Sequence, residues 1–368
     1  MGPQDGPEAT VLSVGIVGLP NAGKSTLFRA LTRARVAVAP YPFTTVDPNT
    51  GVAAVPDDRL EKLARLTKAE QVVPASVRVV DIAGLVRGAH RGEGLGNRFL
   101  SHVRDMAALL HVVRAFHHPE VVHVEGEADP LRDIEVVETE LLLADLETLQ
   151  RRADKVRPRA RAADAQARAE LVALEQALEA LDEGRPARSL PQEVRAALRD
   201  LCLLTDKPVA YVVNVAEGQP DGDVQAVRAL AQARGVPVVV ASLRVEEELA
   251  DLPEEEAREY RLLAGLGEGV LDQVVRTGYR LLELVTFFTT ESRQVRAWPV
   301  PRGTRAVQAA GVIHTDMERG FIRAEVVSFE ALVQTGSWQA AWEAGKVRLE
   351  GRDYEVREGD VITFRFQG

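Results

Sequence analysis

A phosphate-binding motif near the start of the chain constrains its fold more than any other feature. Residues 18–25 read GLPNAGKS and match the pattern G-x-x-x-x-G-K-[ST]. The apolar residues 11–17 predict a short strand, and residues 25–31 have the apolar spacing of a helix. In such a loop, glycines let backbone N–H groups turn toward phosphates, and the helix N-terminus attracts their charge. We therefore predict a P-loop nucleotide-binding domain.

The motif also assigns roles to its side chains. Lys24 would bring positive charge to the β- and γ-phosphates as a catalytic group, and Ser25 would offer its hydroxyl to Mg²⁺. The predicted nucleotide-binding residues of this loop are Asn21, Ala22, Gly23, Lys24, Ser25 and Thr26.

A second motif, DIAG, occupies residues 81–84 at the end of an apolar run. Downstream of a P-loop, Asp81 is placed to hold the water shell of the metal, and the N–H of Gly84 can sense the γ-phosphate. Glycine-rich sequence follows at residues 88–97 and predicts a mobile switch.

Four further apolar runs predict the rest of a sheet. They are short, contain few polar residues and are bounded by turn formers or helical spacing, at residues 76–81, 107–113, 208–213 and 236–240. Such runs suit parallel strands that are buried on both faces. The predicted fold class is therefore α/β.

Changes in composition divide the chain into parts. Leu/Ala/Glu/Arg-rich sequence with helical periodicity predicts two long antiparallel helices inserted in the α/β domain, and β-like runs after Gly278 predict a separate small α+β domain. We expect a flexible tail at 1–11, a nucleotide-binding domain at 12–132 and 199–280, a helical insert at 133–198 and a C-terminal domain at 281–368.

The tip of the predicted insert is basic. Only Asp154 and Asp164 oppose a group of positively charged residues, which are Arg151, Arg152, Lys155, Arg157, Arg159, Arg161 and Arg168. This group is either an ordinary solvated helix surface or a contact for the phosphate backbone of a nucleic acid.

The composition excludes several classes of protein. With 45 Lys and Arg against 55 Asp and Glu, the formal net charge is -10, so no overall positive field draws the chain to DNA or to a membrane. No apolar run reaches the roughly 20 residues that a membrane span needs. A single cysteine, Cys202, allows no internal disulfide and no zinc cluster. We expect a cytoplasmic protein.

The loop after residues 208–213 lies where a P-loop domain reads the base. It reads Asn214-Val215-Ala216-Glu217, whereas most P-loop GTPases have N-K-x-D, whose aspartate binds the guanine N1–H and 2-amino group. The longer Glu217 cannot take the position of that aspartate without rearrangement. The loop therefore argues against strict guanine specificity.

Several segments together resemble the YchF/Obg-like ATPase family of P-loop proteins, namely GLPNAGKSTLF, PFTTVDPNTG, DIAGLVRGAHRGEGLGN, HVVRAF, NVAE and AGVIHTDMERGFIRAEVVSFE. The resemblance implies a P-loop domain, a coiled-coil insert and a C-terminal TGS domain of β-grasp type. It also implies a Mg²⁺-dependent ATPase that prefers ATP to GTP, binds ribosomes or their RNA, and regulates translation or a stress response. The alternatives are a guanine-specific ribosome-associated GTPase and a nucleotide-dependent binding switch with negligible hydrolysis.

The resemblance also implies roles for the loops that bind the base and the metal. The base loop would use Asn214 and Glu217, with the backbone of Val215 reading adenine. Thr45, rather than the adjacent Thr44, would add a second hydroxyl to Mg²⁺ beside Ser25 and the water-linked Asp81.

The group that positions water is not the usual glutamine. Leu85 occupies the position of the usual catalytic glutamine and cannot orient water. The resemblance points to His123 as the catalytic histidine, with a loop hydrogen bond as the other reading and His90 as the local alternative. We expect His111, which lies in an apolar run, to pack in the core. Asn21 is a hypothetical K⁺-binding residue.

Overall fold

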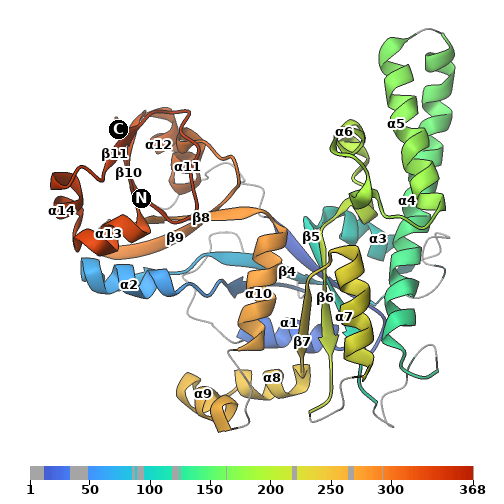
Figure 1. The fold of residues 1–368 in the computed structure, drawn as a ribbon, viewed down its shortest axis with the longest axis horizontal. Helices are drawn as coiled ribbons and strands as arrows, with labels where there is room; N and C mark the ends of the chain where they lie inside the picture. Colours follow the sequence, from blue (N-terminus) through green and yellow to red (C-terminus); the bar gives the residue numbers. More distant parts are fainter. Residues whose placement is uncertain are drawn as a thin grey trace.

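The computed structural model describes residues 12–33, 49–84, 88, 95–117, 123, 126–162, 164–217, 222–263, 269–291 and 293–367. Figure 1 shows a central sheet with helices on it, a long helical hairpin that projects from it, and a second sheet at the opposite side. Among the described residues, no helix combines the length and apolar character required to cross a membrane.

The central sheet has the strand order β2-β4-β1-β5-β6-β7. Its strands are β1 (Ser13–Val17), β2 (Thr50–Ala54), β4 (Ser76–Asp81), β5 (Ala108–Arg114), β6 (Val209–Asn214) and β7 (Val238–Ala241). All neighbours pair in parallel except β2, which is antiparallel to β4 at the edge. Every residue of β1, β5 and β6 is buried, which confirms the predicted α/β class with a doubly covered sheet.

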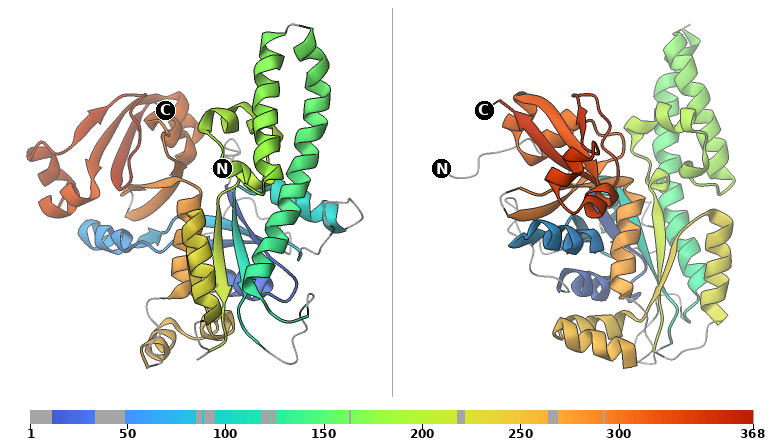
Figure 2. Two further views of the ribbon diagram at one scale, coloured as in Figure 1. Left: turned by 45° about the vertical axis from the view of Figure 1, so that its right-hand side comes forward. Right: turned by 60° about the vertical axis from the view of Figure 1, so that its left-hand side comes forward.

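Helices cover both faces of this sheet (Figure 2). Helices α1 (Lys24–Arg33) and α10 (Val270–Leu281) pack on one face. On the other lie α3 (Leu95–Asp105), α4 (Pro130–Arg161) and α7 (Gly222–Arg234). Helices α8 (Leu243–Ala250) and α9 (Glu254–Leu263) follow β7 at the carboxyl end of the parallel strands.

Strand β2 was not predicted. Its sequence TGVAA is short and has little apolar bulk, so it carries no clear pattern of a strand. The pairing partner and the neighbouring helix specify it instead. A Cβ atom on Gly51 would lie 2.2 Å from Cγ2 of Thr32, so only glycine lets β2 lie this close to α1.

The insert is a hairpin of α4 and α5 (Ala165–Asp182), as predicted. Small and branched side chains fill the seam between the two helices, including Leu149, Ala153, Val156, Ala160, Ala167, Leu174, Ala177 and Leu181. Helix α4 has 32 residues, and its first part packs in the core of the central sheet. One continuous helix therefore joins the nucleotide-binding domain to the insert (Figure 1).

Short helices lead from the hairpin back to the sheet. They are η2 (Ala187–Ser189), α6 (Gln192–Ala197), η3 (Arg199–Leu201) and η4 (Leu204–Asp206). The buried carboxylate of Asp145 accepts hydrogen bonds from the backbone N–H groups of Leu204 and Thr205, both at 2.8 Å. These bonds fix the middle of α4 to η4, the short helix that leads into β6.

The second sheet has the order β11-β10-β12-β8-β9-β3. Its strands are β3 (Gln71–Val73), β8 (Leu284–Thr289), β9 (Gln294–Pro301), β10 (Phe321–Ser328), β11 (Arg348–Glu350) and β12 (Asp360–Phe366). The helices of this part are α11 (Ala306–Ile313), α12 (Thr315–Arg319), α13 (Phe329–Thr335) and α14 (Trp338–Glu343). The assignment of this domain as a TGS domain of β-grasp type stays a prediction.

Strand β3 comes from the N-terminal half of the chain, after α2 (Asp58–Thr67), and pairs in parallel with β9. We had expected this segment to belong wholly to the nucleotide-binding domain. Three residues are too few to show a strand pattern in the sequence, and the edge of β9 supplies the hydrogen-bonding partners that define it. The segment between α2 and β4 thus contributes an edge strand to the second sheet before the chain returns to the central sheet.

Candidate nucleotide-binding site

The phosphate loop connects β1 to α1 at the carboxyl end of the central sheet. Gly18 has φ +146° and Gly23 has φ +106°, and Cβ atoms there would lie 2.4 Å from the Val112 carbonyl oxygen and the Asn214 amide nitrogen. Asn21 has φ 61°, a left-handed conformation that asparagine adopts more readily than most residues. Both motif glycines are therefore required by close packing as well as by backbone conformation.

Lys24 begins α1 and is buried, with Nζ donating a hydrogen bond to the carbonyl oxygen of Leu19 at 2.8 Å. Burial lowers the pKa of Lys24 to about 8, and the charge of Asp81 opposes this shift. A buried ammonium gains from an anionic partner that replaces lost hydration. The phosphates of a nucleotide would provide such a partner.

Ser25 and Asp81 lie together, as the sequence predicts. The Ser25 hydroxyl donates to Oδ2 of Asp81 at 2.7 Å, bringing the start of α1 to the end of β4. A hydroxyl and a carboxylate fit Mg²⁺, which usually keeps several waters and binds substrate phosphates beside one or two protein oxygens. In the described part of the chain, no three His, Cys, Asp or Glu residues form a metal cluster. Thr44 and Thr45 lie outside the described residues.

Gly84 lies against the phosphate loop. A Cβ atom on Gly84 would be 3.1 Å from both Nζ of Lys24 and the backbone nitrogen of Pro20. This contact places the DIAG motif where it can respond to a phosphate held by Lys24. Leu85 and His90 fall outside the described residues.

The base loop is tied to the phosphate loop by Asn214. Its side-chain amide donates to the Ala22 carbonyl at 3.0 Å, and its side-chain oxygen accepts from the backbone N–H of Leu243 at 3.2 Å. The N–H of Val215 donates to the carbonyl oxygen of Ala241 at 2.9 Å. Because the N–H of Val215 is already bonded, the predicted contact of its backbone with adenine would have to be made by its carbonyl oxygen. Glu217 is exposed.

His123 is buried, and its Nε2 lies 2.7 Å from Oδ2 of Asp133 at the start of α4. Burial raises the pKa of Asp133, while the hydrogen bond with His123 opposes that change. A carboxylate at this distance fixes the orientation and tautomer of an imidazole ring. Asp133 was not singled out from the sequence, because an acid in the first turn of a helix is common for reasons unrelated to catalysis.

His111 lies in the core, as predicted. Its ring packs edge-on against Tyr211 with 5.7 Å between ring centres, and burial lowers its pKa to about 4. The ring is therefore neutral near pH 7.

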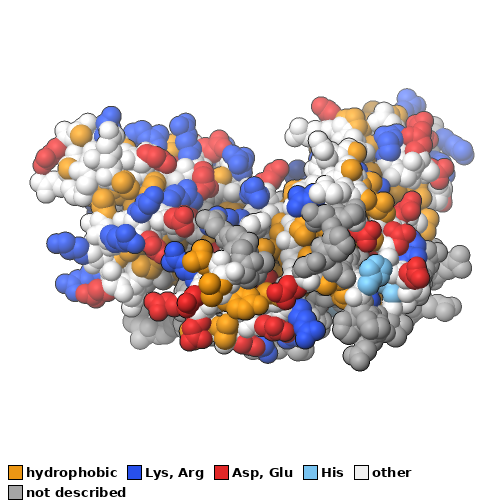
Figure 3. Space-filling model, turned by 60° about the horizontal axis from the view of Figure 1, so that its bottom comes forward, with side chains coloured by type: hydrophobic (Ala, Val, Ile, Leu, Met, Phe, Trp, Pro, Cys, Tyr) orange, Lys and Arg blue, Asp and Glu red, His pale blue; other side chains and the backbone are white. Residues whose placement is uncertain are grey.

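Charges of both signs lie around the site and the insert. Figure 3 views the end of the molecule that carries α8 and α9, where acidic, basic and apolar side chains are interspersed.

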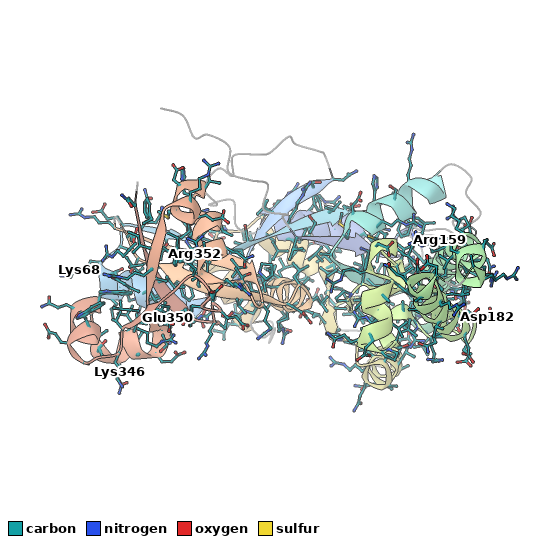
Figure 4. All side chains as sticks on the ribbon, turned by 90° about the horizontal axis from the view of Figure 1, so that it is seen from above. Lys68, Arg159, Asp182, Lys346, Glu350 and Arg352 are labelled. Atoms are coloured by element: carbon teal, nitrogen blue, oxygen red, sulfur yellow. The ribbon has the colours of Figure 1, made fainter. Side chains whose placement is uncertain are left out.

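At the insert tip, Arg157 pairs with Asp154 at 2.7 Å and Arg159 with Asp164 at 2.9 Å. These arginines are thus partly neutralised within the tip. Figure 4 shows Arg159 on the hairpin, far from Lys346 and Arg352 in the C-terminal domain.

Comparisons with known proteins decide the family. A model for the C-terminal part of YchF GTPases, described as "Protein of unknown function (DUF933)", matches residues 284–367, and a model described as "50S ribosome-binding GTPase" matches residues 13–148. "Ribosome-binding ATPase YchF" of Bacillus subtilis (strain 168) is 47% identical over 362 residues, which cover 96% of this chain and 99% of that protein. The chain belongs to the YchF family. The resemblance seen in the sequence is thereby confirmed.

Other YchF relatives are similar over nearly the whole chain. "Ribosome-binding ATPase YchF" of Escherichia coli O157:H7 is 48% identical over 356 residues, covering 96% of this chain and 98% of that protein. "Obg-like ATPase 1" of Oryza sativa subsp. japonica is 41% identical over 366 residues, covering 96% and 92%. The solved "Structure of the Schizosaccharomyces pombe YchF GTPase" matches with a TM-score of 0.88 and 36% identity, covering 99% of this chain and 100% of that one. Membership in the YchF family makes this chain a nucleotide-hydrolysing P-loop enzyme.

Proposed function

We propose that this chain is a Mg²⁺-dependent ATPase that hydrolyses ATP in preference to GTP. The observation that carries the proposal is the base loop, in which Asn214 is bonded to the phosphate loop while Glu217 stands where guanine readers have aspartate. The printed names of relatives include both ATPase and GTPase, so they leave the base preference open. The Val215 carbonyl can accept a hydrogen bond from the 6-amino group of adenine, whereas guanine has an oxygen there, which repels it.

Each of the residues brought together at this site would have a separate role in hydrolysis. Lys24 and the backbone N–H groups of the phosphate loop would stabilise the charge that develops on the transferred phosphoryl group. Ser25 and Asp81 would hold Mg²⁺, which supplies charge neutralisation on the β- and γ-phosphate oxygens when bound. His123, oriented by Asp133, would position the attacking water in place of the missing glutamine.

We further propose that the enzyme acts on the ribosome in the cytoplasm as a nucleotide-dependent regulator of translation or of a stress response. Support comes from the names of the relatives and from the basic insert tip, which could meet ribosomal RNA. Asn21 is proposed to help hold K⁺ beside the phosphates. Turnover should then fall when Na⁺ replaces K⁺, and equal turnover in the two salts would remove this role.

The test is steady-state phosphate release by the full chain with Mg²⁺ and either ATP or GTP, with and without ribosomes. A kcat/KM for ATP at least about tenfold above that for GTP is expected, equivalent to about 1.4 kcal/mol. A higher value for GTP would favour the guanine-specific alternative. If turnover is negligible in every condition while nucleotides still bind, the binding-switch alternative replaces the proposed ATPase.

A further inference from the structure

Besides Asp145, helix α4 carries two further buried acids, which lie seven residues apart. Asp133 is 3% exposed and Glu140 is 5% exposed. A separation of seven residues is about two helical turns, so the two side chains leave the same side of α4 about 10 Å apart along its axis. Buried carboxylates are rare unless they have hydrogen-bonding partners, and both of these acids are hydrogen-bonded.

Each acid binds a different loop of the nucleotide site. Asp133 holds His123, as described above, and Oε1 of Glu140 accepts a hydrogen bond from the backbone N–H of Gly88 at 2.7 Å. Gly88 has φ +83°, a conformation that favours glycine. The Glu140 carboxylate therefore binds the chain at a position whose backbone conformation favours glycine.

Gly88 is closely tethered to the phosphate site. It follows Gly84 by four residues, a length that spans at most about 14 Å when fully extended. Gly84 itself packs against Lys24 and Pro20 of the phosphate loop. A short stretch of chain therefore links the contact of Gly84 with the phosphate loop to the bond between Gly88 and Glu140.

A different side of α4 is anchored to the core. Glu138 accepts a hydrogen bond from the Tyr211 hydroxyl of β6 at 2.7 Å, and Asp145, seven residues later, binds the backbone of Leu204 and Thr205. Glu138 and Glu140 point in nearly opposite directions, because two residues turn a helix by about 200°. The helix is therefore fixed on one side and holds both loops on another, while its far end forms the insert (Figure 1).

We propose that Glu140 and Asp133 are positioning residues for hydrolysis. Glu140 fixes the chain that follows the DIAG motif, and Asp133 fixes His123. The Asp133 part rests on the proposed role of His123, whereas the Glu140 part requires only that the chain hydrolyses a nucleotide.

Two substitutions of Glu140 separate its hydrogen bond from its charge. Glu140→Gln keeps the length and an oxygen acceptor for Gly88 but removes the charge, and Glu140→Asp keeps the charge but withdraws the oxygens by one methylene. We expect the single-turnover rate of Glu140→Gln to be within about twofold of wild type. The rate of Glu140→Asp should be about tenfold lower than that of wild type, which corresponds to about 1.4 kcal/mol. The nucleotide Kd should change by less than about twofold in both, since the bond positions a loop without touching the nucleotide.

The matched control is Glu138→Ala, which breaks the bond to Tyr211 on another side of the same helix. It should lower Tm while leaving the single-turnover rate within about twofold of wild type. The proposal is overturned if Glu140→Asp hydrolyses nucleotide as fast as wild type, or if Glu140→Gln is as slow as Glu140→Asp. It is also overturned if Glu138→Ala slows hydrolysis as much as Glu140→Asp. Measuring all variants with both ATP and GTP keeps this test independent of base preference, and including His123→Ala shows separately whether the proposed histidine role fails.

Discussion

The amide side chain of Asn214 bonds directly to the carbonyl oxygen of Ala22, so the base loop after β6 and the phosphate loop after β1 form one unit. Gly23 makes this contact possible, because a Cβ atom there would lie 2.4 Å from the Asn214 nitrogen. The residues proposed to contact the base are thus bonded directly to the loop proposed to bind the phosphates.

Exchanging the base loop for the common guanine pattern should change the preferred base. In the double variant Val215→Lys with Glu217→Asp, the shorter carboxylate can reach guanine N1–H and its amino group. We expect the ratio of ATP to GTP affinity to fall by about tenfold or more, since unmatched polar groups in such sites cost large factors in discrimination. Isothermal titration with both nucleotides checks this. An unchanged ratio would show that the loop does not read the base, and Val215→Lys alone serves as the control.

Nucleotide binding should weaken at alkaline pH. Burial lowers the pKa of Lys24 to about 8 in the free protein, so above that pH its side chain loses the charge that attracts phosphate. Kd should therefore rise by up to about tenfold for each further pH unit, because the neutral lysine must regain a proton to bind. Lys24→Arg, which stays charged throughout, should give weaker but pH-independent binding. A flat profile in the wild type would contradict this account of Lys24.

Removal of the His123 side chain should slow hydrolysis without loss of nucleotide. We expect His123→Ala to lower kcat by about 100-fold, the lower range for general acid–base catalysis, and to leave Kd within about twofold. Single-turnover rates and equilibrium titration separate the two quantities. His111→Ala is the contrasting variant, since that buried ring should affect Tm. Equal rates for His123→Ala and wild type would leave His123 with a purely structural bond to Asp133.

Reversing the basic tip should weaken attachment to ribosomes. We expect the triple change of Arg157, Arg159 and Arg161 to Glu to reduce cosedimentation and flatten its salt dependence, because fewer counterions are then released from RNA. As a control, three exposed arginines outside the tip are also changed to Glu, namely Arg228, Arg244 and Arg258. This triple variant has the same change in net charge. Equal loss in both triples would indicate a general charge effect, and no loss in the tip variant would exclude the tip as the contact.

The sequence predicts where the two motifs that carry Ser25 and Asp81 lie in the fold, because each motif is a short local pattern at the end of a strand. Strand β4 has the predicted bounds, and Ser25 and Asp81 meet at 2.7 Å although 56 residues separate them. Parallel strands that end at one sheet edge bring such motifs together without further information.

What could not be predicted depends on contacts between distant elements. Strands β2 and β3 are defined by their pairing partners, and their own sequences carry little pattern. Asp133 and Glu140 lie in a helix that contains both buried and exposed acids, and the sequence gives no sign of which are buried. Only the packing of α4 against the loops after β4 and β5 distinguishes them.

The most direct test of the central claim is a displacement experiment with the purified chain. A fluorescent adenine nucleotide bound with Mg²⁺ is displaced by increasing ATP or GTP, which isolates base preference from any dependence of hydrolysis on a partner. The account predicts that ATP displaces the probe at a concentration at least about tenfold lower than GTP, a difference of about 1.4 kcal/mol. If GTP displaces it equally well or better, Glu217 reads guanine, and the chain is a GTPase with the same fold and phosphate site.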